Sequence, residues 1–206
     1  DVNVGHPEID EKKMMVRVLK AIQSVCDVPL QIDSTKPEVI EAGLRYYNGK
    51  PILNSVNGEE QSLATVLPLV KKYGASVVGL ALDENGIPKT AEGRFEIAKR
   101  IVERAEAVGI DRKDVYIDCL TLTVSAEQAA CRQTLEALHR VKTELGCKTC
   151  LGVSNISFGL PNRELVNRTF LTMAMEQGLD LPIINPNVES MTGAVRAFRV
   201  LNGIDK

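Results

Sequence analysis

Four short apolar segments of this chain each end in a carboxylate or carboxamide residue, namely Asp33, Asn54, Asp118 and Asn155. The segments have the length and the near-continuous apolar character of parallel strands buried on both faces. Two carboxylates and two carboxamides supply acceptors and donors for a flat heterocycle with several N–H groups and ring acceptors. If the four strand ends meet, they form a binding site for such a ring.

A pterin ring carries this pattern of donors and acceptors. Its pyrimidine edge presents an N–H group beside an NH2 group, and one carboxylate can accept a hydrogen bond from each. Asp118 and Asp33 are the candidates for that role, with Asn54 serving ring atoms that need either a donor or an acceptor. Asn155 can donate to or accept from a ring nitrogen without changing its own charge.

Helix capping is the competing explanation, because Asp and Asn residues at strand ends often cap the next helix or tie a turn. Asp33 is the clearest case, since Ser34, Thr35, Lys36 and Pro37 follow it directly. Capping would be the better explanation for any one of the four residues taken alone. Their shared position at four strand ends favours a binding site.

Strand-like and helix-like segments alternate along the whole chain. Strands are expected at 2–4, 28–34, 51–55, 76–82, 115–120, 149–154 and 181–185. Helices are expected at 10–25, 37–47, 59–73, 90–108, 125–145, 163–177 and 189–201. Pro37 suits a first helical turn, Thr90 is a candidate N-cap, and Gly74 and Gly146 follow expected helix ends.

Strict alternation predicts an α/β fold with a parallel sheet, either open and doubly wound or closed into a barrel. Residues 1–7 contain no GxGxxG turn of the kind that an open dinucleotide-binding fold has after its first strand. Regular spacing and polar strand ends favour a (β/α)8 TIM barrel, in which the C-terminal ends of all strands converge on one rim. The seven expected units predict a single domain, 1–206, that lacks its first β/α unit. A seven-stranded barrel that closes differently is the alternative.

Composition excludes several classes of function. The net charge of −2 gives no basic surface for nucleic acid, and the apolar stretches are too short to span a membrane. No segment resembles a signal peptide, so we expect a cytoplasmic protein. Five cysteines, an odd number, argue against a disulfide framework. The pair Cys147 and Cys150 has CxxC spacing but no second pair, so no metal site is expected.

The strand-end strings resemble those of the pterin-binding family. They are Ile32-Asp33-Ser34-Thr35, Leu53-Asn54-Ser55, Tyr116-Ile117-Asp118 and Gly152-Val153-Ser154-Asn155-Ile156-Ser157. Their order matches that of the family over essentially the whole chain. Within the family they are most similar to the methyltetrahydrofolate:corrinoid methyltransferases, which include the folate module of cobalamin-dependent methionine synthase. The sister branch, dihydropteroate synthase, carries basic elements on its last two strands, where this chain has 152–155 and 184–187.

The resemblance implies a set of ligand-binding residues. Asn155 would reach the N5 side of the ring, and Asp118 would act with it in catalysis. The residues that would hold or enclose the pterin or folate are Asp33, Asn54, Asp118, Gly152, Ser154, Asn155 and Arg163, the last on the loop that helps to enclose the ring. Asn3 matches a family position that lies near the rim.

The resemblance also implies a methyltransferase that binds methyltetrahydrofolate and passes its N5 methyl group to cobalt(I). The cobalamin or other corrinoid would be supplied by a partner protein or domain, and a homodimer is suggested. Asn155, with water and Asp118, would form a donor network that stabilises charge at N5 in the transition state. A single carboxylic acid as proton donor is less favoured, because no acidic residue with a plausibly raised pKa adjoins Asn155 in sequence.

Two other functions stay open. One is a dihydropteroate-synthase-like enzyme that condenses a pterin pyrophosphate with an aromatic amine, for which basic residues at the last two strand ends are missing. The other is a folate-binding module without catalytic activity inside a larger protein. Corrinoid-dependent turnover distinguishes the methyltransferase from such a module.

Overall fold

The computed structural model describes residues 1–205 as seven strands and the helices that connect them. The strands are β1 (Val2–Asn3), β2 (Gln31–Asp33), β3 (Ile52–Asn57), β4 (Ser76–Leu80), β5 (Val115–Asp118), β6 (Lys148–Gly152) and β7 (Leu181–Ile183). The α-helices are α1 (Glu11–Gln23), α2 (Pro37–Tyr46), α3 (Glu60–Tyr73), α4 (Ala91–Ala107), α5 (Ala130–Arg140), α6 (Arg163–Glu176) and α7 (Glu189–Leu201). Shorter helical turns are η1 (Arg112–Asp114), η2 (Val141–Leu145) and η3 (Val153–Ser157).

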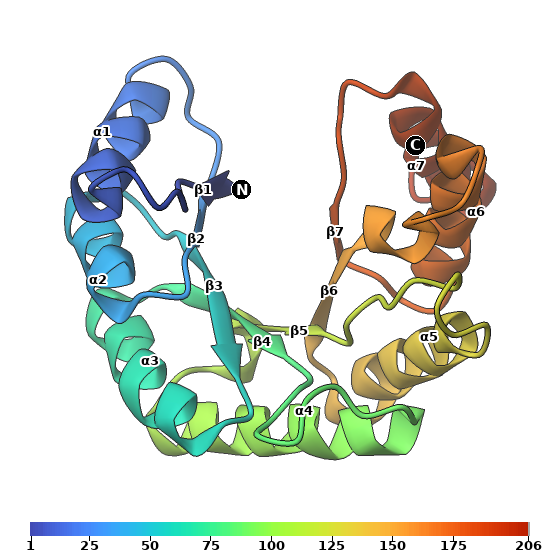
Figure 1. Ribbon diagram of the computed structural model, residues 1–206, viewed down its shortest axis with the longest axis horizontal. Coiled ribbons are helices and arrows are strands. Elements are labelled where there is room, and N and C mark those ends of the chain that lie inside the picture. The colour runs from blue at the N-terminus through green and yellow to red at the C-terminus, as the bar shows by residue number, and fades with distance from the viewer. Residues whose placement is uncertain (206) are drawn as a thin grey trace.

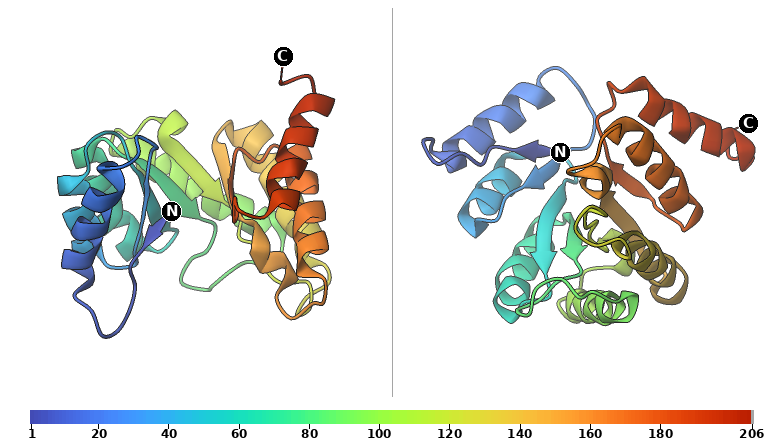
Figure 2. Two further views of the ribbon diagram at one scale, coloured as in Figure 1. Left: turned by 90° about the horizontal axis from the view of Figure 1, so that it is seen from above. Right: turned by 45° about the vertical axis from the view of Figure 1, so that its right-hand side comes forward.

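The seven strands form one sheet in chain order, from β1 to β7, and every neighbouring pair is parallel. The strand order never reverses, as it would in a doubly wound sheet. The sheet curls with its helices on the outside, and the strands surround a common centre (Figures 1 and 2). This arrangement confirms the α/β barrel class that the alternation predicted.

The curled sheet is open between its two edge strands. Among residues 1–205, β1 pairs only with β2 and β7 only with β6, and Figure 1 shows the two edges on opposite sides of the opening. A cavity of about 200 Å³ lies between these edges, with walls that include Asp1, Gln31 and Pro182. Seven strand–helix units are one fewer than in a closed TIM barrel, which agrees with the expected barrel that lacks one β/α unit.

The core lies between the sheet and the ring of helices. In β4, Val77 and Val78 point to opposite faces and are both fully buried. Met15 and Leu19 of α1 pack against the same core that contains Ile32 of β2. Burial on both faces explains the near-continuous apolar strands, and each buried aliphatic side chain contributes about 1.5–3 kcal/mol.

Most of the expected helix ends are confirmed. Thr90 caps α4 by accepting a 3.2 Å hydrogen bond from the N–H group of Gly93. Pro37 occupies the first turn of α2, and Gly74 ends α3 in the left-handed conformation with φ of 65°. The left-handed region suits glycine because it has no Cβ.

Several expected elements are wrong in their bounds, among them two that adjoin the predicted site. The helix expected at 125–145 begins only at α5, because the hydroxyls of Thr123 and Ser125 each donate a 2.7 Å hydrogen bond to the carbonyl of Phe158. These contacts hold the preceding segment against the loop after η3. The strand expected at 149–154 ends at Gly152, where the chain turns into the 3-10 helix η3.

Candidate functional site

Asn3, Asp33 and Asn54 form one row across the C-terminal ends of β1, β2 and β3. Asn3 pairs in register with Asp33, and Asp33 with Asn54. Residues in register share a face of the sheet, so the three side chains lie side by side. The amide Nδ2 of Asn3 donates a 2.9 Å hydrogen bond to Oδ2 of Asp33. The first two predicted pterin ligands are therefore adjacent.

Asp33 does not cap the helix that follows it. Lys36 occupies the N-cap position of α2, and the described residues include no side-chain hydrogen bond at that cap. The N–H group of Lys36 instead donates to the hydroxyl of Ser34 at 3.1 Å. Because the capping explanation fails, the carboxylate of Asp33 is left at the strand end, oriented by Asn3.

Asp118 ends β5 and lies two residues beyond the row of Asp33 and Asn54. Asn54 pairs with Val78, and Val78 pairs with Tyr116 rather than with Asp118. A bulge at Ser55 and the stagger of tilted strands in a barrel produce this offset. Asp118 is therefore not in register with Asp33 and Asn54, although all three side chains lie at the C-terminal end of the sheet.

The carboxyl group of Asp118 is buried and hydrogen-bonded to backbone. Its Oδ1 atom accepts a 2.7 Å hydrogen bond from the N–H group of Leu120, and the backbone N–H group of Gly152 also favours the ionised carboxylate. Burial raises the pKa of Asp118 to about 6, although these two N–H groups and the positive charge of Arg94 oppose the rise. Asp118 therefore changes its charge just below neutral pH.

Gly152 brings Asp118 and Asn155 together. Its backbone N–H group lowers the pKa of the Asp118 carboxyl group, and a Cβ atom added at Gly152 would lie 3.3 Å from Nδ2 of Asn155. The carboxamide of Asn155 thus lies directly against the glycine backbone. Asn155 and Ser154 are exposed and belong to η3, whereas Ser154 was expected at the end of the strand and Asn155 directly after it.

Arg163 fixes the turn that carries Asn155. It is the first residue of α6, as the helix expected at 163–177 predicted, and it directly follows the loop that the family resemblance assigned to enclosing the ring. Its Nη2 atom donates to the carbonyl of Ser154 at 3.1 Å, and its Nε atom donates to the hydroxyl of Ser157 at 3.0 Å. The guanidinium group also lies over the ring of Phe158, 4.6 Å from its centroid. Arg163 is therefore placed to hold η3 in position.

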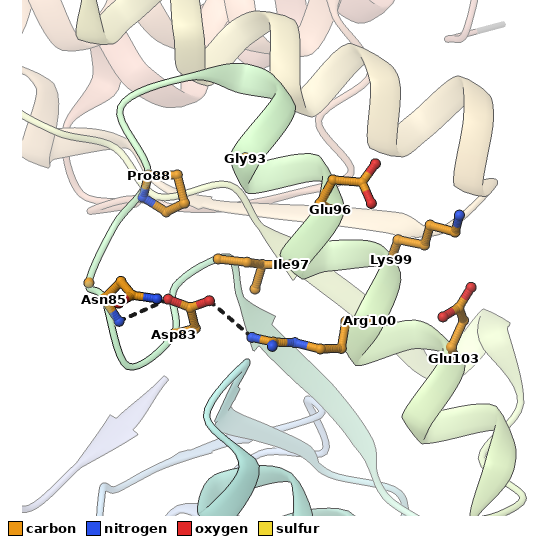
Figure 3. A pocket seen from close by; sticks show the side chains of 10 residues that line it. Asp83, Asn85, Pro88, Gly93, Glu96, Ile97, Lys99, Arg100 and Glu103 are labelled. Carbon is orange, nitrogen blue, oxygen red and sulfur yellow. Dashed lines mark hydrogen bonds and ion pairs between the residues drawn. The ribbon is translucent and has the colours of Figure 1, made fainter.

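A cavity of about 660 Å³ lies away from these residues. It lies between the β4–α4 loop and helix α4, where Arg100 donates a 3.1 Å hydrogen bond to Asp83 (Figure 3). A second cavity, of about 410 Å³, is closer, because Ser55 and Asn57 in its wall follow Asn54 on β3. The volumes of these two cavities therefore do not by themselves identify the site.

Neither a metal centre nor a membrane span is found in the described part of the chain. Residues 1–205 contain no group of three His, Cys, Asp or Glu side chains placed to hold a metal ion. None of their helices is both long enough and apolar enough to cross a membrane.

Sequence reasoning missed Arg94, which lies behind Asp118. Arg94 is fully buried on α4, although an arginine in an isolated helical pattern is usually placed on the solvent face. Its spacing to Ala98, Ile101 and Ala105 was the available signal, because these positions share one face of a helix and that face is buried.

Known proteins resemble this chain in sequence and in fold. Residues 1–185 match the family described as pterin binding enzyme. A methionine synthase of Mycobacterium tuberculosis is 37% identical over 195 residues, which cover 88% of this chain and 16% of that protein. The methionine synthase of Mycobacterium leprae is 36% identical over 177 residues, covering 80% of this chain and 15% of the relative. This chain thus spans about a sixth of the length of those relatives.

A relative of more similar length is the methylcorrinoid:tetrahydrofolate methyltransferase of Eubacterium limosum. It is 31% identical over 205 residues, which cover 97% of this chain and 74% of that protein. Among solved structures, the dihydropteroate synthase of Yersinia pestis superposes with a TM-score of 0.76 at 18% identity, covering 98% of this chain and 80% of the other. That of Xanthomonas albilineans gives 0.76 at 21% identity, with 98% and 76% covered. At these identities the structural likeness shows the fold alone. The family match and the relatives together show that this chain belongs to the pterin-binding enzyme family.

Proposed function

We propose that this chain binds methyltetrahydrofolate through its pterin ring and transfers the N5 methyl group to the cobalt of a corrinoid held by a partner protein or domain. The observation that carries the proposal is the convergence of Asp118 and Asn155 on the backbone of Gly152. A carboxylate that can bind a pterin edge and a carboxamide that can reach a ring nitrogen are thereby adjacent. The relatives named as methionine synthase and methylcorrinoid:tetrahydrofolate methyltransferase support the same reaction class.

The carboxylates would hold the ring. Asp118, ionised above its pKa of about 6, can accept hydrogen bonds from the adjacent N–H and NH2 groups of the pyrimidine edge. Asp33 and Asn54 offer a second group of polar atoms on neighbouring strands, and Asn3 orients the Asp33 carboxylate. A carboxylate that accepts two parallel hydrogen bonds fixes both the position and the rotation of a flat ring.

Asn155 would assist the departure of the folate nitrogen. When the bond between N5 and the methyl carbon breaks, its electron pair remains on N5, and a proton must reach that nitrogen to make a neutral amine. The corrinoid supplies the electron pair that forms the new cobalt–carbon bond. The amide of Asn155 donates a hydrogen bond toward N5, and a water molecule supplies the proton that N5 takes up, while the ionised Asp118 carboxylate holds the pyrimidine edge. The reverse reaction uses the same contacts.

Two measurements test this function. Calorimetric titration with methyltetrahydrofolate is expected to show binding that Asp118→Asn weakens strongly. Anaerobic methyl transfer to free cob(I)alamin is expected to fall by about 10²–10³-fold in Asn155→Ala, since one preorganised donor is worth about that much. Asn202→Ala, at the end of α7, is the matched control and should retain both binding and turnover.

The outcomes separate the alternatives. Folate binding without any transfer by the wild-type chain would indicate a non-catalytic folate module. Condensation of a pterin pyrophosphate with 4-aminobenzoate would indicate the dihydropteroate-synthase reaction. Normal transfer by Asn155→Ala with unchanged folate affinity would contradict the role of Asn155. The suggested homodimer stays a prediction, which light scattering of the purified chain tests.

A further inference from the structure

Arg94 is a buried cation behind the proposed site. It lies in the first turn of α4 with none of its surface exposed. Its Nε atom donates to the carbonyl of Pro88 at 2.9 Å, and its Nη1 atom lies 3.1 Å and 3.0 Å from the carbonyl oxygens of Cys119 and Leu120. The hydroxyl of Thr134 is 2.7 Å from the same Nη1 atom. One side chain therefore joins the β4–α4 loop, the end of β5 and helix α5.

The surroundings of Arg94 leave its charge without a direct ion pair. All of its hydrogen-bond acceptors are neutral, and among the described residues its Nη2 atom has no partner. Burial lowers the pKa of Arg94, while the charges of Glu127 and Asp118 oppose that change. A buried cation costs several kcal/mol unless its surroundings compensate for the lost water. Packing alone would be served better by an apolar residue at this position.

The segment that Arg94 holds has an unusual backbone conformation. Leu120 has φ of 62°, in the left-handed region that side chains with a Cβ disfavour by about 1–2 kcal/mol. Its N–H group points to Asp118, and its carbonyl oxygen receives hydrogen bonds from Arg94 and from Thr134 at 3.0 Å and 3.1 Å. Both polar groups of this residue are thus fixed, and such strain persists where the surrounding contacts determine it.

We propose that Arg94 is a positioning residue for pterin binding: it holds Leu120 so that its N–H group orients the Asp118 carboxylate, and its charge favours the ionised carboxylate. This inference rests on the proposed function, because Asp118 is the residue through which Arg94 acts. Arg94 itself contacts no predicted ligand-binding side chain directly. Its effect reaches the site through the backbone between Asp118 and Leu120 and through the electric field.

The other titratable groups around Asp118 are few. The thiols of Cys119 on its own strand end and of Cys150 on β6 both have pKa values that burial raises, so they are neutral at pH 7. On the other side, β4 presents the apolar Leu80 in register with Asp118. Glu127, in the loop before α5, acts on Arg94. Within residues 1–205, Arg94 is therefore the one cation whose charge lowers the pKa of the Asp118 carboxyl group.

The test begins with the Asp118 carboxyl titration, measured by 13C NMR in the full chain without folate. Arg94→Met is expected to raise the midpoint, since the positive charge of Arg94 lowers the pKa of the Asp118 carboxyl group. Arg94→Lys restores the charge and should bring the midpoint back toward the wild-type value. Arg104→Met is the matched control, because Arg104 lies on the same helix but pairs with the exposed Glu60.

The second readout is the dissociation constant for methyltetrahydrofolate at pH 7.5. Arg94→Met and Arg94→Lys are both expected to raise it about tenfold, because a lysine ammonium cannot reproduce the planar fork that reaches Pro88 and Leu120 together. Thr134→Val keeps the charge and removes one anchor of the Leu120 carbonyl, so a smaller increase, roughly threefold, is expected. Circular dichroism and melting temperature establish that each variant is folded.

These experiments distinguish a failure of the positioning role of Arg94 from a failure of the proposed function. An unchanged Asp118 midpoint in folded Arg94→Met, together with an unchanged dissociation constant, overturns the role of Arg94. If Arg94→Met does not fold, unchanged folate binding in both Arg94→Lys and Thr134→Val overturns it instead. If the wild-type chain binds no folate, the proposed function fails, and with it the positioning role, even where the titration shows that Arg94 acts on Asp118.

Discussion

The side-chain amide of Asn3 donates a 2.9 Å hydrogen bond to the carboxylate of Asp33 on the neighbouring strand, 30 residues away in sequence. The bond uses one oxygen of Asp33 and so fixes the direction in which the other oxygen points. Asn3 itself is held by β1, the first edge strand of the sheet, and its Oδ1 atom accepts a 2.8 Å hydrogen bond from the N–H group of Gly5.

Asn3→Ala is therefore expected to weaken folate binding without unfolding the chain. A hydrogen bond to a charged group contributes about 1.5–3 kcal/mol, so the dissociation constant should rise by roughly tenfold or more. Calorimetric titration measures the effect, with Asn202→Ala as a control of the same chemistry at the end of α7. An unchanged affinity in Asn3→Ala would show that Asp33 needs no orienting partner or binds no ligand.

Folate affinity is expected to depend on pH through Asp118. Its pKa of about 6 means that the carboxyl group is ionised at pH 7 and protonated at pH 5. The protonated form loses acceptor capacity, so the dissociation constant should rise about tenfold between pH 7 and pH 5. In Asp118→Asn, the dissociation constant should no longer change in this way between pH 7 and pH 5. If the change persists in this variant, another group causes it.

Asp118 should also give the stability of the folded chain a distinctive pH dependence. Its pKa is 3.8 in the unfolded chain and about 6 in the folded chain, so the folded state binds more protons between these values. The stabilising contribution is full below pH 3.8 and is lost as the pH rises through about 6. Relative to the wild type, Asp118→Asn should therefore gain about 2 kcal/mol of stability between pH 4 and pH 7.5.

Urea unfolding at the two pH values measures this difference. Asp10→Asn is a useful contrast, because hydrogen bonds from Lys13 lower the pKa of Asp10. The contribution of Asp10 to stability therefore has the opposite pH dependence from that of Asp118, because it is lost as the pH falls. A wild-type chain whose stability relative to Asp118→Asn is the same at both pH values would rule out the raised pKa.

Gly152→Ala is expected to separate binding from turnover. The backbone at Gly152, with φ of −75° and ψ of 93°, is open to any residue, but an added methyl group would lie 3.3 Å from the amide nitrogen of Asn155. The carboxamide must shift by a few tenths of an ångström. Methyl transfer should fall by roughly tenfold while folate affinity changes less, because a small displacement costs more in the transition state than in binding.

Gly193→Ala provides the control for that substitution. An added Cβ atom at Gly193 meets no other atom within 4 Å, and the residue lies inside α7. The change should leave turnover intact and stabilise the helix by about 1 kcal/mol. Steady-state kinetics and thermal melting of both glycine variants measure these outcomes, and equal turnover in Gly152→Ala and wild type would contradict the contact with Asn155.

The sequence by itself determined the order of the elements and the strand ends that carry polar residues. The spacing of apolar residues and the helix-end residues Pro37, Thr90 and Gly74 act locally, over only a few neighbouring residues. The alternation of strands and helices could therefore be predicted from the sequence. The row of Asp33 and Asn54 followed from the same reasoning, because parallel strands end at one rim. The strings around these residues also identified the family.

Only the tertiary structure decided which groups meet and what their charges are. Gly152 lies between Asp118 and Asn155 because β5 and β6 pair side by side, which places a carboxyl group of raised pKa next to the carboxamide. No such acid adjoins Asn155 in sequence. The bulge at Ser55 and the burial of Arg94 likewise depend on contacts between distant segments. Burial and long-range packing set pKa values and side-chain orientation, and neither is encoded in any single stretch of the chain.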